Sequence, residues 1–351
     1  MAERAAGGEG AGKDGAGAAE RRLRALAVGL GPIGVATTRL ALSRRSLDVV
    51  GAVDLDAAKQ GKDLAELLGL PEPTGVAVER DLEAALARLD LDVVLLCTSS
   101  FMPAVREDLL RCCRAGVDVV SSCEELLYPA LQHPDLAAEI DAAARAGGAT
   151  ILGTGVNPGF VLDFIPVIAS AVAYEVERVH GIRIVDAGRR RLPLQQKVGA
   201  GMLREDFEAK AAAGKLGHIG MRESVALIGR ALGFELDEVE QTVEPVIATE
   251  ERKTPFLVIP AGNVAGIRNR GFGRRGGQTV VELDLQMYVG APDPRDEIFL
   301  AGDPPVHLLF EGGIFGDSAT AAIVVNSARQ VVEAPPGLLT ILDVAPPRLA
   351  R

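Results

Sequence analysis

A glycine-rich turn near the start of the chain constrains the fold most strongly. The turn, Gly29-Leu30-Gly31-Pro32-Ile33-Gly34, follows the apolar run Leu26-Ala27-Val28 and precedes a helical pattern over Val35–Leu42. The next apolar run, Val49–Val53, stops at Asp54. Strand, glycine turn, helix, strand and acidic residue in this order are typical of a dinucleotide-binding domain.

The positions of the turn have separate physical roles in this prediction. Gly29 permits the tight turn, Gly31 lets backbone N–H groups approach a pyrophosphate, and Gly34 lets the helix pack closely on the strand. Pro32 and Ile33 open the helix, and the N-terminus of that helix stabilises an anion. We therefore expect these five residues to contact a dinucleotide.

Two further segments complete the predicted cofactor site. Asp54 can accept hydrogen bonds from the ribose hydroxyls and repels a 2′-phosphate, which favours NAD. Lys59 and Lys62 offer positive charge nearby, so NADP stays open, although solvated helix charges are the simpler interpretation of these lysines. Thr98-Ser99-Ser100 follows a later strand, where a small polar loop would cover the nicotinamide ribose or would only form a turn.

The first half of the chain alternates between short apolar strands and helical segments. Further strands are expected at Val93–Cys97, Asp118–Ser121 and Thr150–Gly153, with helices at Lys62–Leu68, Pro103–Ala115 and Pro134–Ala146. Continuous apolar strands separated by helices indicate a parallel sheet covered on both faces. This half is predicted to be a doubly wound, Rossmann-type α/β domain.

The second half has a different pattern. Apolar and polar residues alternate over Val281–Val289, which is the period of a sheet with one buried face. A helical stretch over Glu205–Phe234 precedes it, so we expect an α+β substrate domain with an open mixed or antiparallel sheet. The predicted divisions are a tail over 1–21, a dinucleotide domain over 22–155 with 317–351 packing back on it, and a substrate and oligomerisation domain over 156–316.

The composition of the chain argues against nucleic-acid binding, membrane insertion and secretion. The net charge of −11 gives no positive field for nucleic acid. The apolar stretch Phe160–Tyr174 contains Asp163 and Pro166 and is too short for a bilayer, so it predicts a buried helix rather than a membrane span. The four cysteines lack paired ligand spacing and no signal peptide is evident, so we expect no metal site and a cytoplasmic protein with reduced thiols.

Several polar segments are candidates for the chemistry. Ser122-Cys123-Glu124-Glu125 follows a strand, where Glu124 and Glu125 can supply acid–base catalysis, although Ser122 and Glu125 also fit a capping box. The loop carrying Asn157 and Pro158 joins the two domains and is either a hinge or a pocket wall. Arg190 and Lys197 lie in a basic run, and His218 stands between glycines; for each, a surface or structural role is the alternative.

Beyond these motifs, most of the chain resembles one family, the dihydrodipicolinate-reductase-like dehydrogenases. It is most similar to the 2,4-diaminopentanoate dehydrogenases and the native amine dehydrogenases. The similarity lies in seven segments: Gly29–Gly34, Gly51–Leu64, Ser121–Pro129, Gly153–Phe160, Arg190–Gly201, Gly217–Ser224 and Ala334–Leu339.

The resemblance implies NAD(P)-dependent reductive amination of a small ketone or aldehyde with ammonia, and the reverse oxidative deamination. It implies that Glu124 or Glu125 holds the ammonia or amine and that Ser122 and Cys123 lie beside the cofactor. Asn157, Pro158 and His218 become pocket residues, and Arg190 or Lys197 would hold the carboxylate of a diamino acid such as 2,4-diaminopentanoate.

The sequence is compatible with other functions of this fold. The paired histidines, lysine and Ser-Gly-Thr loop of true dihydrodipicolinate reductases are missing, which disfavours that activity. Another C=N or C=O reductase of this fold, or a dinucleotide-binding sensor without turnover, would share the glycine turn. Because an open sheet has edges that need covering, we also expect a homodimer.

Overall fold

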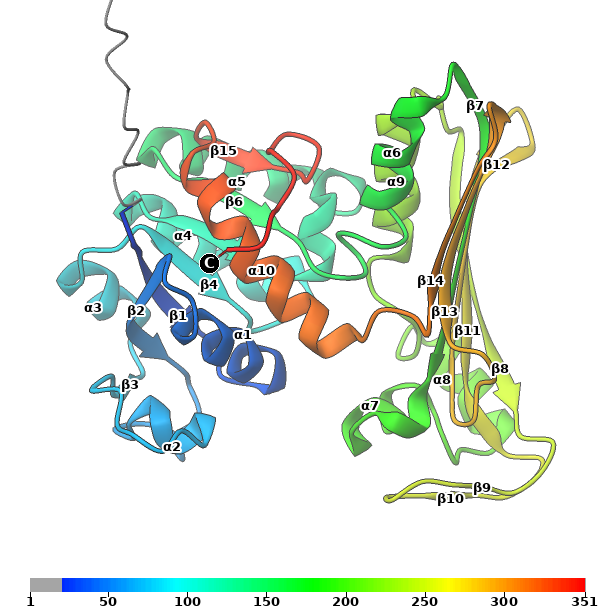
Figure 1. Ribbon diagram of the computed structural model, residues 1–351, viewed down its shortest axis with the longest axis horizontal. Helices are drawn as coiled ribbons and strands as arrows, with labels where there is room; N and C mark the ends of the chain where they lie inside the picture. Colours follow the sequence, from blue (N-terminus) through cyan, green and yellow to red (C-terminus); the bar gives the residue numbers. More distant parts are fainter. Residues whose placement is uncertain (1–20, 351) are drawn as a thin grey trace, which may run out of the picture.

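The computed structural model describes residues 21–350, and the tail expected over 1–21 lies outside them except for Arg21. The described residues form two large β-sheets, each with its own helices, which stand side by side, and one small two-stranded sheet (Figure 1). Helix α10, the orange helix at the centre of Figure 1, runs from the second sheet back across the first domain.

The first sheet is a seven-stranded parallel sheet with the strand order β15-β6-β5-β4-β1-β2-β3. Its strands are β1 (Leu23–Val28), β2 (Leu47–Val53), β3 (Val78–Glu79), β4 (Val93–Leu96), β5 (Asp118–Ser121), β6 (Thr150–Gly153) and β15 (Gly337–Leu339). The order reverses between β1 and β4, which is the crevice where ligands bind in open α/β sheets. The doubly wound prediction is confirmed.

Two apolar cores lie on opposite faces of this sheet. One core includes residues of α1 (Pro32–Leu42), α2 (Leu64–Leu68) and α10 (Gly316–Val332). The other core is made with α3 (Leu82–Arg88), α4 (Met102–Ala115) and α5 (Pro134–Gly147). Because both faces are buried, β4 and β6 have no exposed position, which explains their continuous apolar sequences.

The second sheet has six strands in the order β14-β13-β7-β12-β11-β8. Strands β7 and β12 are parallel and every other pair is antiparallel, so the sheet is mixed. The strands are β7 (Glu175–Asp186), β8 (Glu238–Ile247), β11 (Val264–Arg275), β12 (Gln278–Tyr288), β13 (Arg295–Asp303) and β14 (Val306–Glu311), and β9 (Arg252–Lys253) and β10 (Val258–Ile259) form a separate hairpin.

One face of the second sheet is the buried face that the alternation predicted. Val281, Leu283, Leu285 and Met287 are all buried in one core with residues of α8 (Arg204–Ala212) and α9 (Met221–Ala231). In Figure 1 the opposite face of this sheet has no helix on it. The remaining helices of this half are α6 (Phe164–Ala169), α7 (Leu192–Lys197), and the short turns η3 (Ser170–Val172) and η4 (Ala187–Arg189).

Two sequence predictions in this half are wrong. The stretch Phe160–Tyr174 is not one buried helix: only α6 and η3 form, and Val172 and Tyr174 are exposed. The helical stretch Glu205–Phe234 is divided into α8 and α9 because glycines with positive φ, ending at Gly220 (φ 91°), interrupt it. The result is a loop that reaches toward the first domain.

No helix among residues 21–350 is long and apolar enough to cross a bilayer.

Candidate functional site

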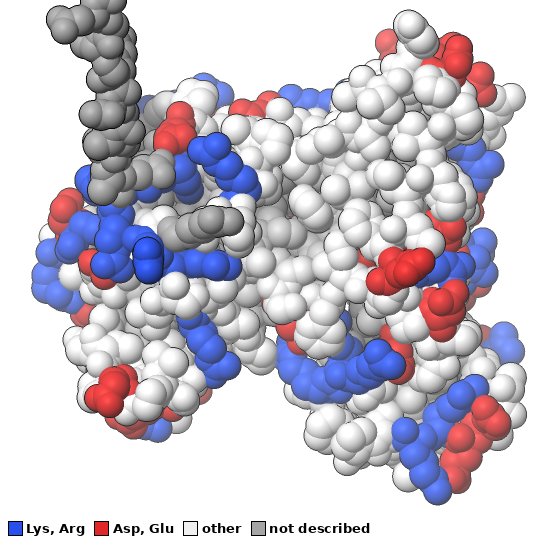
Figure 2. All heavy atoms as spheres, viewed as in Figure 1, with Lys and Arg blue, Asp and Glu red and all other residues white. Residues whose placement is uncertain are grey.

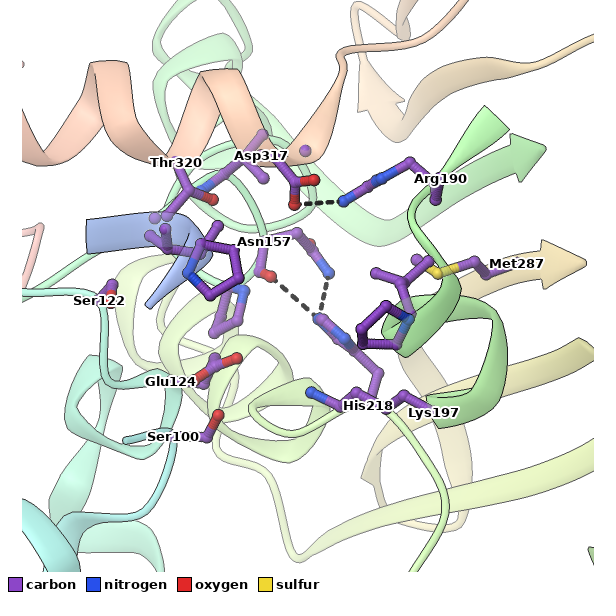
Figure 3. A pocket seen from close by; sticks show the side chains of 18 of the residues that line it. Ser100, Ser122, Glu124, Asn157, Arg190, Lys197, His218, Met287, Asp317 and Thr320 are labelled. Atoms are coloured by element: carbon purple, nitrogen blue, oxygen red, sulfur yellow. Dashed lines mark hydrogen bonds and ion pairs between the residues drawn. The ribbon is translucent and has the colours of Figure 1, made fainter. Parts of the chain in front are cut away.

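A first cavity, of about 400 Å³, lies where the carboxyl ends of the parallel strands meet the second sheet. The first domain contributes the loops after β1, β4, β5 and β6, and the second contributes β7, β11, β12 and α7. Helix α10 closes it with Gly316, Asp317 and Thr320. Segments from the whole length of the chain therefore meet at this one cavity (Figure 3).

The glycine turn fits a dinucleotide at one end of the first cavity. Gly31, Pro32 and Ile33 line it, and a Cβ added to Gly31 would meet no atom within 4 Å, so the space beside its backbone is free for a ligand. A Cβ on Gly34 would lie 1.7 Å from the Gly29 carbonyl oxygen, so only glycine allows α1 to approach the turn this closely. Helix α1 begins after Gly31 with no side-chain cap, which leaves its N-terminal N–H groups free for a phosphate.

Asp54 lies at the end of β2, as the sequence predicted, but its carboxylate already has partners. One oxygen accepts from the Leu30 backbone N–H at 2.7 Å and pairs with Lys59 Nζ at 2.8 Å, and the other accepts from the Asp56 backbone N–H. Burial acts against the charged form, yet the hydrogen bonds from Lys59 and the backbone lower the pKa of Asp54 overall. Lys59 is therefore paired rather than free in solvent, and Lys62 is exposed.

The other predicted cofactor residues divide into two groups. Thr98, Ser99, Ser100 and Ser122 line the first cavity. Cys123 does not: it is buried in the core beneath the sheet, and burial raises the pKa of its thiol to about 12. A thiol in that environment packs as an apolar group and does not reach a ligand.

The two adjacent glutamates point to different surroundings. They lie in η1 (Glu124–Leu127), which begins after Cys123 with no side-chain cap, so the capping box that was the alternative role for Ser122 and Glu125 does not form. Glu124 is half-buried, lines the first cavity and has no hydrogen-bond or ion-pair partner among residues 21–350. Glu125 is buried; its Oε2 accepts from the Met102 backbone N–H at 2.7 Å, at the N-terminus of α4, and lies 3.1 Å from His133 Nε2. Only Glu124 faces the first cavity.

The loop after β6 and the loop before α9 meet at Asn157 and His218. His218 Nε2 lies 3.0 Å from the Asn157 carbonyl oxygen and 2.9 Å from the Asn157 side-chain nitrogen (Figure 3). Burial, together with the charge of Lys197, lowers the pKa of His218 to about 4, so the imidazole is neutral at physiological pH. The His218 backbone N–H donates to Asn269 Oδ1, a fully buried residue of β11 that sequence reasoning missed.

Arg190 lies in the first cavity but is already paired. It is buried, its Nη2 lies 2.5 Å from Asp317 Oδ1, and its guanidinium stacks 4.8 Å from the ring of Phe315. Arg191 Nε lies 3.6 Å from Asp317 Oδ2. Asp317 was not predicted, because nothing in its local sequence distinguishes it from an ordinary first-turn acidic residue.

Lys197 differs from the other cations around the first cavity. It is exposed and has no ion-pair partner among the described residues. Its side chain extends toward the part of the cavity where Glu124 lies (Figure 3). Lys197 is the last residue of α7. Figure 2 shows a cluster of basic side chains where Figure 1 draws α7, beside the hollow between the two halves of the molecule.

A buried ion pair that the sequence did not reveal lies at the back of the first cavity. Arg183 of β7 is 3% exposed, and its Nη1 lies 2.7 Å from Asp296 of β13, which is 0% exposed. Arg183 Nη2 donates to the Ile314 carbonyl, and Asp296 accepts from the Ile314 backbone N–H. The pair fixes the start of the segment that leads into α10.

A Rossmann-type sheet with this glycine turn, which opens on a polar cavity against a second mixed sheet, is the arrangement typical of a dinucleotide-dependent dehydrogenase. Residues 160–350 match the family described as the 2,4-diaminopentanoate dehydrogenase C-terminal domain. The chain is 30% identical over 338 residues to the 2,4-diaminopentanoate dehydrogenase of Acetoanaerobium sticklandii, covering 93% of this chain and 94% of that protein. The chain belongs to the 2,4-diaminopentanoate dehydrogenase and amine dehydrogenase family, whose members are dinucleotide-dependent enzymes that act on amine groups.

Other relatives agree with this membership. The amine dehydrogenase of Streptomyces virginiae is 26% identical over 342 residues, covering 90% of this chain and 94% of that protein. The solved structure of the amine dehydrogenase from Mycobacterium smegmatis superposes with a TM-score of 0.82 at 25% identity, covering 93% and 97% of the two chains. A dihydrodipicolinate reductase from Paenisporosarcina shares the fold at a TM-score of 0.51 and 14% identity, covering 90% and 96%.

Proposed function

We propose that this enzyme interconverts a small amino acid that carries a second, reacting amine with the corresponding oxo amino acid and ammonia. One observation carries the proposal: Glu124 and Lys197 are charges of opposite sign, both without partners in the described chain, on one cavity next to the cofactor turn. An amine complements Glu124 and a carboxylate complements Lys197. A plain ketone or monoamine would leave Lys197 without a partner.

The reaction balances with NAD(P)+ as the oxidant. The protonated amine and water give the ketone, an ammonium ion and one proton, and the hydride leaves the carbon that carries the amine. The bound dinucleotide supplies only the hydride acceptor at its nicotinamide ring. The protein must hold the amine, remove its proton and return a proton to the departing ammonia.

We assign these proton transfers to Glu124 because it lines the first cavity and has no partner in the described chain. A carboxylate oxygen of Glu124 holds the ammonium ion and accepts its proton, so that the nitrogen lone pair can form the C=N bond as the hydride leaves. Water then adds to that bond and loses one proton to solvent. The same carboxyl group returns its proton to the nitrogen, which leaves as ammonia while the hydroxyl group loses its proton and becomes the ketone oxygen. Neutral His218 and Asn157 position the substrate and take no part in net charge transfer.

For the cofactor we propose NAD with limited discrimination against NADP. The Asp54 carboxylate would repel a 2′-phosphate, and Lys59, 2.8 Å from it, would offset part of that repulsion.

The function is tested by cofactor oxidation in the presence of ammonia. We expect turnover with 2-amino-4-oxopentanoate and weaker turnover with 4-oxopentanoate and simple ketones. Glu124→Gln should lower kcat for every carbonyl by at least about 100-fold with cofactor affinity unchanged, since it removes both the charge and the acid. Glu125→Gln should keep kcat on substrates without a second amine. Full activity of Glu124→Gln would show that Glu124 is not the proton carrier.

We also propose that the protein is a homodimer. The second sheet ends in two strands, β14 and β8, whose outer backbone groups no further strand of the sheet pairs, and pairing across copies is one way to cover them. Light scattering at low micromolar concentration tests it, and a mass equal to one chain would reject it.

A further inference from the structure

A second cavity, of about 910 Å³, adjoins the first. The two share Ser100, Lys197, Gly217 and His218 in their walls. The second cavity lies between the loops after β4 and β5 of the first domain and the α8–α9 region of the second. A molecule bound at Glu124 can therefore extend into this neighbouring space.

The buried part of its wall is acidic. Glu223, in the first turn of α9, is 1% exposed, and its Oε1 accepts from the Gln132 side-chain amide of the other domain. Glu125 is 8% exposed and uses only Oε2, for the Met102 N–H and His133. The second oxygen of each carboxylate has no partner in the described chain, although both side chains line the cavity.

Such a wall favours a cationic donor. A carboxylate this deeply buried is costly unless a positive or hydrogen-bonding group meets it. Burial raises the pKa of Glu223, and the nearby charge of Glu125 raises it further. An ammonium group placed against the two free oxygens would satisfy both carboxylates.

Positively charged side chains also line this cavity and determine what kind of ligand it can bind. Lys197 stands where the two cavities meet, and Lys215 and Arg222 lie exposed and half-buried in the wall. The remaining acidic residue of the wall, Glu208, is exposed and paired with Arg204. The mixture suits a zwitterion better than a bare cation.

We propose that the second cavity binds the amino-acid head of the substrate, with its non-reacting ammonium on Glu223 and Glu125 and its carboxylate on Lys197. The reacting amine then lies on Glu124 in the first cavity. Glu223 is a specificity-determining residue that selects diamino monocarboxylates over compounds with one amine. This inference rests on the proposed function and adds the site of the second amine to it.

The test compares two substrates that differ only in the second amine. 2,4-Diaminopentanoate and 4-aminopentanoate share the carboxylate and the reacting amine. Because a charge-assisted hydrogen bond to a buried carboxylate is lost with 4-aminopentanoate, we expect wild-type kcat/KM to favour 2,4-diaminopentanoate by about 10- to 100-fold. Equal kcat/KM values on the wild-type enzyme would overturn the inference without any variant.

The variant Glu223→Gln tests whether Glu223 causes the preference for the diamino acid. Glutamine keeps the size of the side chain and an acceptor for Gln132, so kcat/KM for 4-aminopentanoate should stay within about twofold while the preference for the diamino acid is lost. The matched control is Glu208→Gln, which removes a carboxylate from the same cavity and should leave the preference intact. An equal fall for both substrates in Glu223→Gln would mean that Glu223 only holds the domains together. If the wild-type enzyme binds NAD(P) but turns over neither amine, the proposed function is wrong, and this inference is wrong with it.

Discussion

The ion pair between Arg183 and Asp296 gives the sharpest stability prediction. Both side chains are almost fully buried and lie 2.7 Å apart, and burial lowers the pKa of Arg183 and raises that of Asp296. Asp296→Asn keeps the shape and an acceptor for the Ile314 N–H but leaves the Arg183 charge without a counter-ion. Removing one partner of a buried pair costs about 3–5 kcal/mol. At about 2–4 °C per kcal/mol for a domain of this size, the melting temperature should fall by about 6–20 °C.

The assay is thermal unfolding followed by circular dichroism, with two comparison variants. Glu208→Gln breaks an exposed pair with Arg204 and should change stability by less than about 0.5 kcal/mol. Replacing both buried partners, Arg183→Met with Asp296→Leu, removes the stranded charge and should recover most of the loss. A fall of under 2 °C for Asp296→Asn, or a double variant as unstable as the single one, would refute the reasoning.

Four further predictions concern single residues of the first domain. Gly31→Ala, at an extended position with open space around the added Cβ, should leave the melting temperature unchanged and weaken dinucleotide binding at least tenfold by calorimetry; Gly34→Ala should destabilise the fold because its Cβ would overlap a carbonyl oxygen. Burial raises the pKa of Asp118 from 3.8 to about 6, so the stability it contributes is present below pH 4 and is lost as pH rises through 6. At pH 7.5 the free energy of unfolding of Asp118→Asn should therefore exceed that of wild type by about 1–2 kcal/mol, after allowance for partial exposure. This difference in stability should disappear as pH falls toward 4, and thermal unfolding over that pH range measures it. Asp54→Ser should raise the NADPH to NADH ratio of kcat/KM about tenfold, and an unchanged ratio would show that Asp54 does not read the ribose.

The features that sequence predicted well are those encoded in short spacings. The turn over Gly29–Gly34 and the alternation over Val281–Val289 depend on neighbours in the chain, and both have the predicted surroundings. The prediction of one buried helix over Phe160–Tyr174 was wrong because an apolar run does not itself indicate which parts of the fold it packs against. It crosses between the two sheets, so Phe164 packs in a core while Val172 and Tyr174 reach solvent.

The choice between Glu124 and Glu125 shows why local reasoning stops short of the site. Strand alternation would place the two side chains on opposite faces, but the residues form a 3₁₀ turn, in which neighbours point roughly 120° apart. Glu125 turns to the free N-terminal amide of α4, and Glu124 turns to the first cavity. That outcome depends on the position of Met102, which no spacing within the motif contains.

Pairing over long distances in the chain decides which charges are available to a substrate. Four basic residues, Arg183, Arg190, Arg191 and Lys197, line the first cavity. By residue type alone, each could bind the carboxylate of a substrate. Asp296 and Asp317, more than a hundred residues away, neutralise the three arginines. Lys197 is left without a partner in the described chain, as is Glu124. The substrate must then match the charges that folding leaves unpaired, and finding them requires the whole fold, because each pairing joins two strands or helices that only the tertiary structure brings together.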